Sequence, residues 1–293
     1  MIKSKKNKVE TFIIGVFLLI GAIFAIQPIL HIIALSFTNA GSSRNLSGLA
    51  ILPKGFTLFN YKILLQNPNI IRSLLVSIFI TLVGTGLSIL FTITTSYVLT
   101  RKDLIGKQIF MFMVIVIMVF EPGIVPEFIA MRKVGLTDSL SILIFYKLVN
   151  VYYLILLMRF FENIPEEIIE SAKMEGAGHL TILFKVLLPL VKSGVSTIAM
   201  FYFVFRWNEY FRASIYISNM NKWPLQVVLR QFVVLEDNTA LMGFGKLMDS
   251  YGSVDFKTLQ AAAIVLGMSI IFIIYPLILK FFTKGTFVGA VKE

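Results

Sequence analysis

The chain consists of long apolar stretches separated by shorter polar ones, and the length of the apolar stretches indicates its class. Crossing the hydrocarbon core of a bilayer as a helix takes roughly 20 apolar residues. Six stretches have about this length, at residues 12–36, 73–100, 108–131, 139–160, 193–217 and 258–282. We therefore expect an all-α integral membrane protein with six transmembrane helices.

The first apolar stretch follows a basic tail, as the core of a secretory signal would. It is too long for a signal, however, and no small-x-small cleavage site precedes a polar mature sequence. We interpret residues 12–36 as an uncleaved first span. The pattern contains no second domain, so residues 1–293 are expected to form a single transmembrane domain.

Basic residues between the spans predict the orientation. If the N-terminus is cytoplasmic, 14 lysines and arginines lie in the cytoplasmic segments 1–11, 101–107, 159–192 and 280–293. A smaller number, 10, lie in the outer segments 37–72, 132–138 and 218–257. Because lysine and arginine collect on the cytoplasmic side of membrane proteins, both termini are predicted to be cytoplasmic (N-in, C-in).

The composition agrees with the membrane class and excludes other functions. Hydrophobic residues make up 57% of the chain and charged residues 15%, whereas soluble domains are closer to a half and a quarter. The net charge of +11 is spread in ones and twos between apolar runs, which is typical of flanks at an anionic leaflet and not of a nucleic-acid surface. The chain has no cysteine, and His31 and His179 lack metal-ligand spacing. We expect no metal site, no bound cofactor and no nucleic-acid partner.

Two of the spans contain residues that disrupt a helix. The third span contains Glu121-Pro122-Gly123 and then Pro126, and the fifth contains the polar sequence 206–209. Backbone groups that a proline frees inside a membrane must be satisfied by neighbouring helices or by a wet cavity. These two spans are therefore expected to face the interior of a helix bundle and not lipid.

Residues 162–192, between the fourth and fifth spans, predict a short cytoplasmic helix. Pro165 suits a first turn, because its missing N–H would have no partner there. Glu166 and Glu167 lie where the helix dipole favours negative charge, and Gly176 suits a helix end in the left-handed conformation. The result is an acidic amphipathic helix of about three turns. It is either a solvated connector or a helix that docks into a groove on a cytosolic partner.

The spacing within this segment resembles the EAA loop of ABC importer permeases. That loop reads Glu-Ala-Ala, three residues, Gly, nine residues, an aliphatic residue, one more residue and then Leu-Pro. The matching positions here are Glu170, Ser171, Ala172, Gly176, Val186, Leu188 and Pro189, with serine in place of the middle alanine. The resemblance implies a coupling helix that docks against an ATP-binding subunit.

Other regions resemble the carbohydrate-type branch of this family, to which the smaller maltose permease belongs. Residues 207–210 look like its Trp-Asn signature, and the outer-loop sequence 222–230 is similar to a subfamily linked to complex, often acidic oligosaccharides. The C-terminal tail of the branch is similar to Lys284-Gly285 followed by Gly289, Ala290, Val291 and Lys292. The resemblance covers nearly the whole chain and implies that this tail contacts the ATP-binding subunits.

By resemblance, the complex holds this permease, a second related permease, two ATP-binding subunits and an extracytoplasmic sugar-binding protein, in the cytoplasmic (inner) membrane of a bacterium. The chain itself is not expected to be an enzyme. A phosphate-binding loop needs Gly, four residues and then Gly-Lys-Ser/Thr. Neither Gly106-Lys107 nor Gly245-Lys246 has that context, so ATP and Mg²⁺ are assigned to the partner subunits.

Charged residues inside the spans are candidates for a substrate pathway, since a charge within a membrane is costly. The candidates, with polar and aromatic neighbours in the fifth span, are Lys147, Arg206, Trp207, Asn208, Glu209, Tyr210 and Arg212. Structural roles remain alternatives. Arg206, Glu209 and Arg212 are spaced for an ion network along one helix, while Trp207 and Tyr210 suit either stacking on a sugar or packing.

The excess of cations among these central charges predicts an anionic ligand. Three cations stand against Glu209 there, while the glutamates of the third span are expected nearer the outer surface. We expect an oligosaccharide, with an acidic, uronate-containing one favoured and a neutral one as the alternative. An ion-gradient-driven secondary transporter would instead predict inverted repeats with acidic residues at mid-membrane. A membrane enzyme would need a polar catalytic cluster. The sequence contains neither such a cluster nor inverted repeats with acidic residues at mid-membrane.

Overall fold

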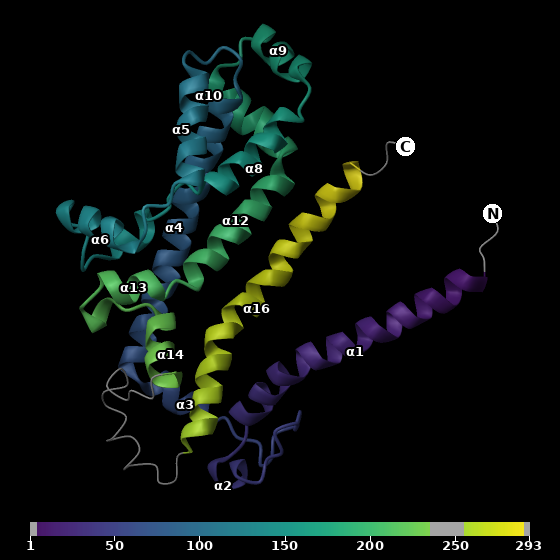
Figure 1. Ribbon diagram of the computed structural model, residues 1–293, viewed down its shortest axis with the longest axis vertical. Coiled ribbons are helices and arrows are strands. Elements are labelled where there is room, and N and C mark those ends of the chain that lie inside the picture. The colour runs from purple at the N-terminus through teal and green to yellow at the C-terminus, as the bar shows by residue number, and fades with distance from the viewer. Residues whose placement is uncertain (1–4, 235–254, 290–293) are drawn as a thin grey trace. The chain divides into compact units, whose positions relative to one another are not determined.

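The computed structural model describes residues 5–234 and 255–289, and over these residues the chain is helical, without a β-strand. The helices up to residue 162 are α1 (Lys5–Ser36), α2 (Ala40–Ser43), α3 (Phe59–Gln66), α4 (Pro68–Thr100), α5 (Lys107–Val119), α6 (Ile124–Lys133), α7 (Leu140–Phe145) and α8 (Val151–Glu162). The elements that follow are α9 (Glu166–Met174), α10 (His179–Thr181), the π-helical turn η1 (Ile182–Leu187), α11 (Leu188–Leu190), α12 (Lys192–Trp207), α13 (Phe211–Tyr216), the 3-10 turn η2 (Met220–Lys222), α14 (Leu225–Val233) and α16 (Phe256–Gly289) (Figure 1).

Proximity along the backbone divides the chain into two compact units. The α1 unit comprises residues 1–71 and 228–269, and the bundle unit comprises residues 72–227 and 270–293. The long helices α4 and α16 each continue from one unit into the other. Residues 162–192 and all the candidate pathway residues belong to the bundle unit.

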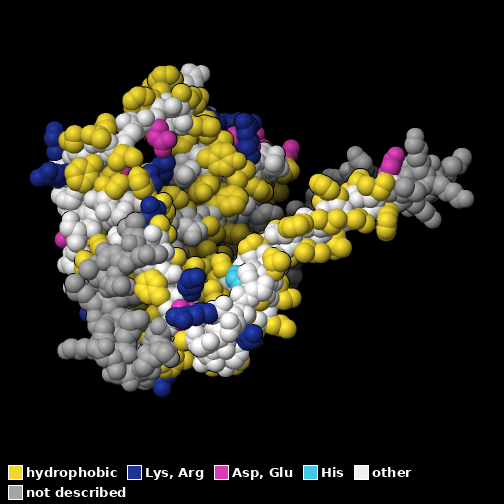
Figure 2. All heavy atoms as spheres, turned by 60° about the horizontal axis from the view of Figure 1, so that its bottom comes forward, with side chains coloured by type: hydrophobic (Ala, Val, Ile, Leu, Met, Phe, Trp, Pro, Cys, Tyr) yellow, Lys and Arg dark blue, Asp and Glu magenta, His cyan; other side chains and the backbone are white. Residues whose placement is uncertain are grey.

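In the α1 unit, an apolar helix is exposed along most of its length. Hydrophobic side chains cover α1 (Figure 2), and the side chain of Phe17, for example, is 75% exposed. A helix that is apolar all round and exposed is suited to lipid and not to water. The C-terminal end of α1 is hydrogen-bonded to Asn60 of α3, whose Nδ2 donates to the carbonyl of Ser36 at 3.0 Å. The Oδ1 atom of Asn60 accepts from Thr258 of α16 at 3.3 Å.

The bundle unit is organised by a stripe of hydroxyl side chains on α4. Its members are buried and recur mostly every fourth residue, at Ser73, Ser77, Thr81, Thr85, Ser88, Thr92 and Ser96. Residues at this spacing share one face of a helix, and small side chains allow helices in a membrane to approach closely. Thr92 forms a hydrogen bond of 2.7 Å with Tyr202 of α12, and the hydroxyl of Ser77 accepts from the backbone N–H of Leu225 at 2.7 Å.

Three of the six predicted spans are continuous apolar helices long enough to cross a membrane, at Glu10–Ser36, Pro68–Thr100 and Phe256–Pro276. Two further candidates are pairs of helices with a bend between them. The chain bends by 120° between α5 and α6, and by 87° between the helical segment His179–Leu190 and α12. Counting each pair as one span gives up to five spans among the described residues. The chain is a helical, multi-pass membrane protein, and the six-span topology remains a prediction.

The third and fifth spans, which contain the helix-disrupting residues, are interrupted, and so is the fourth, in which the sequence predicted no break. The third ends at Val119 and resumes after Gly123, whose φ of +81° suits glycine. The fifth is interrupted after Trp207, before α13. The fourth, predicted at 139–160, is interrupted between Phe145 and Val151. Hydrophobicity measures whether a stretch tolerates lipid, but it does not require the stretch to be one straight helix.

The break in the fourth span is stabilised by side chains from elsewhere in the bundle unit. Arg206 donates from Nη1 to the carbonyl of Leu143, a group that the end of α7 leaves without a helical partner. The hydroxyl of Tyr202 accepts from the backbone N–H of Asn150 at 2.8 Å. Asn150 in turn caps α8 by accepting from the N–H of Tyr152 at 3.0 Å. The freed backbone groups thus find partners inside the protein, as a membrane environment requires.

Candidate coupling helix and transport cavity

The predicted helix of the 162–192 segment is present as α9, and its end has the expected geometry. Gly176 has a φ of +80°. Its N–H donates to Lys173 O at 2.9 Å, and the N–H of Ala177 donates to Ala172 O at 3.0 Å. These two bonds form a Schellman motif, which ends a helix with a left-handed residue. Pro165 occupies the position just before the first turn, one residue earlier than predicted.

The helix α9 is amphipathic and held by one apolar face. Ile169 is 6% exposed and packs into a cluster that includes Phe161, Ile182 and Leu183. Glu170, Ser171 and Gly176 are exposed, whereas Ala172 is partly buried against the same cluster. The helix therefore presents most of its EAA-like positions to the surroundings of the chain.

An ion pair fixes the first turn of α9 to the loop that follows α4. The ammonium group of Lys102 contacts the carboxylate of Glu166, and this hydrogen bond raises the pKa of Lys102 above its usual value. Both side chains are largely exposed, so the pair contributes little to stability. Its effect is to restrict the position of the helix end.

The segment that leads from α9 into α12 contains a feature that the sequence did not predict. Residues Ile182–Leu187 form a π-helical turn, and the N–H of Leu188 donates to Leu183 O. Pro189 lacks an N–H, and its ring crowds the carbonyl four residues earlier, so a regular turn is disfavoured here. Leu188 is partly buried and Pro189 is exposed. The two Leu-Pro residues of the EAA-like motif therefore help to determine the turn by which the chain enters α12.

The structure brings Arg206 to an interior position and not to a cavity. Its side chain is 2% exposed, and Nη2 donates to the hydroxyl of Ser88 at 3.0 Å. Because α12 ends at Trp207, the predicted ion network along one helix does not extend from Arg206 to the other charges. Only Glu209 and Arg212 make the predicted contact, at 3.8 Å.

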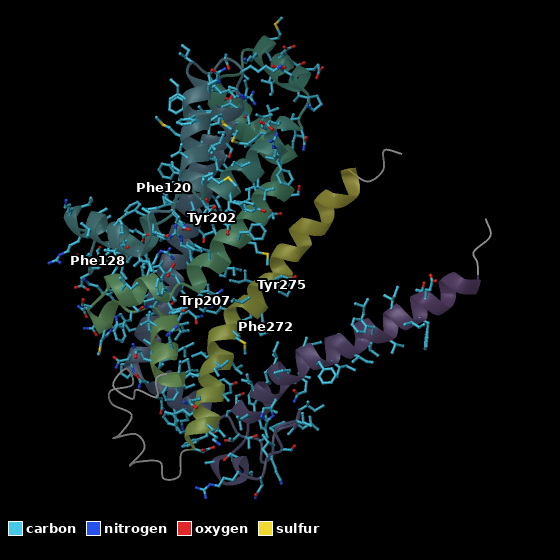
Figure 3. The ribbon with its side chains drawn as sticks, in the orientation of Figure 1. Phe120, Phe128, Tyr202, Trp207, Phe272 and Tyr275 are labelled. Atoms are coloured by element: carbon cyan, nitrogen blue, oxygen red, sulfur yellow. The ribbon has the colours of Figure 1, made fainter. Side chains whose placement is uncertain are left out.

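The other residues of the interrupted fifth span have separate surroundings. Trp207 is 1% exposed and lies at the end of α12, which also carries Tyr202 (Figure 3). Asn208 is exposed and donates from Nδ2 to Val204 O of the preceding turn at 3.0 Å. Tyr210 packs against a cluster that includes Tyr216. Trp207 thus packs inside the bundle unit, where it borders an apolar cavity of about 260 Å³ that is separate from the one lined by Lys147.

Arg212 lies at the centre of a polar network between the third, fourth and fifth predicted spans. Its guanidinium carbon is 3.9 Å from the ring centre of Tyr146, and Nε is 3.6 Å from Oε1 of Glu127. The hydroxyl of Tyr216 donates to the same Glu127 oxygen at 2.8 Å. With Glu209 on its other side, Arg212 has two carboxylates and an aromatic face as neighbours. The cation is therefore neutralised within the chain.

A cavity of about 480 Å³ lies where the third and fourth predicted spans are broken. Its polar lining includes Lys147 and Glu121, whose Nζ and Oε1 atoms are 3.0 Å apart. Its aromatic lining is Phe120, Phe145, Tyr146 and Tyr152, and Phe120 is labelled at the end of α5 in Figure 3. Sequence reasoning selected Lys147 but missed these aromatic residues. The available signal was the position of the two charged residues: Glu121 lies at the break after α5 and Lys147 at the break after α7.

Two predictions concern residues of other kinds. Among the described residues, no cluster of three or more histidine, aspartate or glutamate side chains is placed to hold a metal ion. Gly289 is the last residue of α16, whereas Ala290, Val291 and Lys292 of the predicted tail lie outside the described residues.

Comparisons with known proteins cover nearly the full chain, although no protein-family model matches it. It is 37% identical to the polygalacturonan/rhamnogalacturonan transport system permease protein YtcP of Bacillus subtilis, over 98% of this chain and 99% of that protein. It is 38% identical to Protein LplC of the same organism, over 93% and 91% of the two chains. A chain in the crystal structure of a bacterial ABC transporter involved in the import of the acidic polysaccharide alginate superposes with a TM-score of 0.89, at 29% identity, over 96% and 99% of the two chains.

These similarities cover nearly the whole chain, and they agree with the resemblance that the EAA-like motif carries. They concern proteins that are transporter subunits and not enzymes. The chain belongs to the family of carbohydrate ABC transport system permeases.

Proposed function

We propose that the chain is one membrane-spanning subunit of an ATP-driven importer, which moves an oligosaccharide delivered by an extracytoplasmic binding protein across the bacterial cytoplasmic membrane. The observation that carries the proposal is the geometry of α9. This short acidic helix is held through Ile169 and leaves Glu170 and Ser171 exposed. Such a surface fits a groove on a partner protein.

The proposed partners are a second related permease, two ATP-binding subunits and the binding protein. In this assembly, the residues that couple ATP hydrolysis to transport are Glu170, Ser171, Ala172, Gly176, Leu188 and Pro189. ATP and Mg²⁺ belong to the ATP-binding subunits, and this chain needs no cofactor of its own. The tail from Gly289 to Lys292 is proposed to contact the same subunits.

The proposed cargo is an acidic oligosaccharide that contains uronate residues. One relative is named for polygalacturonan and rhamnogalacturonan transport, and the similar crystal structure belongs to a transporter for the acidic polysaccharide alginate. Within this chain, Lys147 lines the cavity. Arg206 is buried and bonded to Leu143 O, and Arg212 is paired with Glu127 and Glu209. The geometry therefore favours Lys147 among the candidate pathway residues, because Trp207, Asn208, Glu209 and Tyr210 do not line this cavity.

The test is reconstitution of the complete transporter in proteoliposomes with its binding protein. We expect uptake of oligosaccharide to require internal ATP, to stop with vanadate and to continue when ionophores dissipate ion gradients. Uptake that needs a gradient and ignores ATP would identify a secondary transporter instead.

A substitution in α9 tests the coupling part of the same proposal. Glu170→Lys should abolish most uptake and most stimulation of ATP hydrolysis by the loaded binding protein, because it reverses a charge at the proposed contact. Glu170→Asp keeps the charge and should retain activity. Wild-type coupling in Glu170→Lys would contradict the proposed role of α9.

A further inference from the structure

Glu121 and Lys147 form an ion pair between two broken helices. Glu121 follows the end of α5 and precedes the 120° bend, and Lys147 follows the end of α7. Lys147 also has a φ of +45°, in the left-handed region that few residues other than glycine adopt. A backbone conformation of this kind often marks a functional position, because the surrounding structure must enforce it.

The pair is more accessible than the neighbouring ion pair of Arg212 and Glu209. The side chain of Lys147 is 39% exposed and that of Glu121 is 77% exposed. By contrast, Arg212 is 23% exposed and its partner Glu209 is 9% exposed. An ion pair as exposed as that of Lys147 and Glu121 contributes little to stability, so another carboxylate can replace Glu121 at small cost.

The surroundings of the pair fit a sugar ring that carries a carboxylate. The cavity of about 480 Å³ has the size of a small-molecule site. Tyr152 and Phe120 line it with large exposed faces, at 61% and 69% exposure, which can pack against the C–H faces of a sugar. Tyr146 places its ring centre 5.7 Å from the ammonium group of Lys147, which keeps the cation at the cavity wall.

We propose that the carboxylate of a passing uronate displaces Glu121 from Lys147 and forms an ion pair with the ammonium group in its place. When the cavity is empty, Glu121 pairs with Lys147. When cargo is present, Glu121 competes with the cargo carboxylate for Lys147, so binding stays weak enough for release. The inference rests on the proposed function and deepens it, because it names the cavity and the residue that recognise the acidic group. It also predicts that Lys147 strengthens binding of the acidic ligand, whereas Glu121 weakens it.

The test is equilibrium binding of an oligouronate to the purified, complete transporter, with the carboxyl-reduced, neutral form of the same sugar as the control ligand. Lys147→Gln should weaken binding of the oligouronate about 10-fold, since a charge-assisted contact is lost. Glu121→Gln should strengthen it about 3-fold, since the competitor is removed. Neither substitution should change binding of the neutral sugar. Lys133 is an exposed cation on α6 outside the cavity lining. As the control, Lys133→Gln should change the binding of neither the oligouronate nor the neutral sugar.

Two results would overturn the inference. In the first, both substitutions weaken binding equally and the exchange of the two residues (E121K/K147E) restores it, as expected of a purely structural pair. In the second, neither substitution alters binding of the oligouronate. ATP-dependent uptake is measured in the same wild-type preparation. If the wild type imports no oligosaccharide, the proposed function fails, whereas normal import with unchanged variants refutes only the role of the ion pair.

Discussion

Gly84 of α4 lies directly against the side chain of Arg206 in the bundle unit. A Cβ atom built on Gly84 would be 2.7 Å from both Cδ and Nε of the arginine. Arg206 cannot retreat easily, because its two terminal nitrogens are held by Leu143 O and the hydroxyl of Ser88. The glycine therefore provides the space in which a buried cation reaches the end of α7.

Gly84→Ala is expected to destabilise the protein by about 1–3 kcal/mol, the usual cost of overpacking a core. Gly86 is the matched control on the same helix, since a Cβ there would meet nothing within 4 Å. Gly86→Ala should be neutral or slightly stabilising, because alanine favours a helix over glycine. Thermal unfolding of the detergent-solubilised protein compares the two. Equal effects of both substitutions would show that the contact with Arg206 does not restrict position 84.

Arg206→Gln should lower stability without changing the preference between acidic and neutral sugars. The substitution leaves the carbonyl of Leu143 without its charged donor, which costs about 1–3 kcal/mol for a buried group. Ser88→Ala removes only one of the arginine's partners and should have a smaller effect. Thermal unfolding and uptake of both sugars are the measurements. Selective loss of acidic-sugar uptake in Arg206→Gln would return this residue to the substrate pathway.

Gly176→Ala should disturb α9 through its backbone. The φ of +80° costs a residue with a side chain about 1–2 kcal/mol, although space for a Cβ is open. Gly178→Ala is the control, because Gly178 has a φ of −73° and equally open space. ATP hydrolysis by the assembled transporter, with and without loaded binding protein, should be less coupled in Gly176→Ala alone. Identical coupling in both variants would mean that the helix end tolerates a side chain.

Single cysteines test the predicted orientation in a chain that has none of its own. Lys173 on α9 and Arg132 on α6 are both exposed. On intact cells, an impermeant maleimide should label Arg132→Cys, and it should label Lys173→Cys only after permeabilisation. Labelling of position 173 from outside the cell would reverse the topology.

The local features of the α9 segment were predictable from the sequence because they depend on neighbouring residues. The two glutamates of the first turn and Gly176 specify the start and end of a helix within one short stretch. The same holds for the length of α1 and α4, which follows from uninterrupted hydrophobicity. Spacing alone was sufficient where structure is local.

The break in the fourth span and the cavity depended on contacts that the sequence order does not reveal. The gap between Phe145 and Val151 exists because Arg206 and Tyr202, far along the chain, satisfy its backbone groups. Lys147 was identified by its charge alone. Its partner comes from another predicted span, and no spacing rule joins the two.

The uninterrupted hydroxyl-bearing helix α4 has a mechanical consequence for the three broken spans around it. Each break already lacks regular helical hydrogen bonds, so a change of angle there sacrifices few of them, whereas bending α4 would disrupt a full ladder. The Ser and Thr side chains of α4 also lose little rotational freedom when they pack, and each hydroxyl can rotate toward a new acceptor. Changes of angle during transport are therefore expected at the three breaks and not within α4.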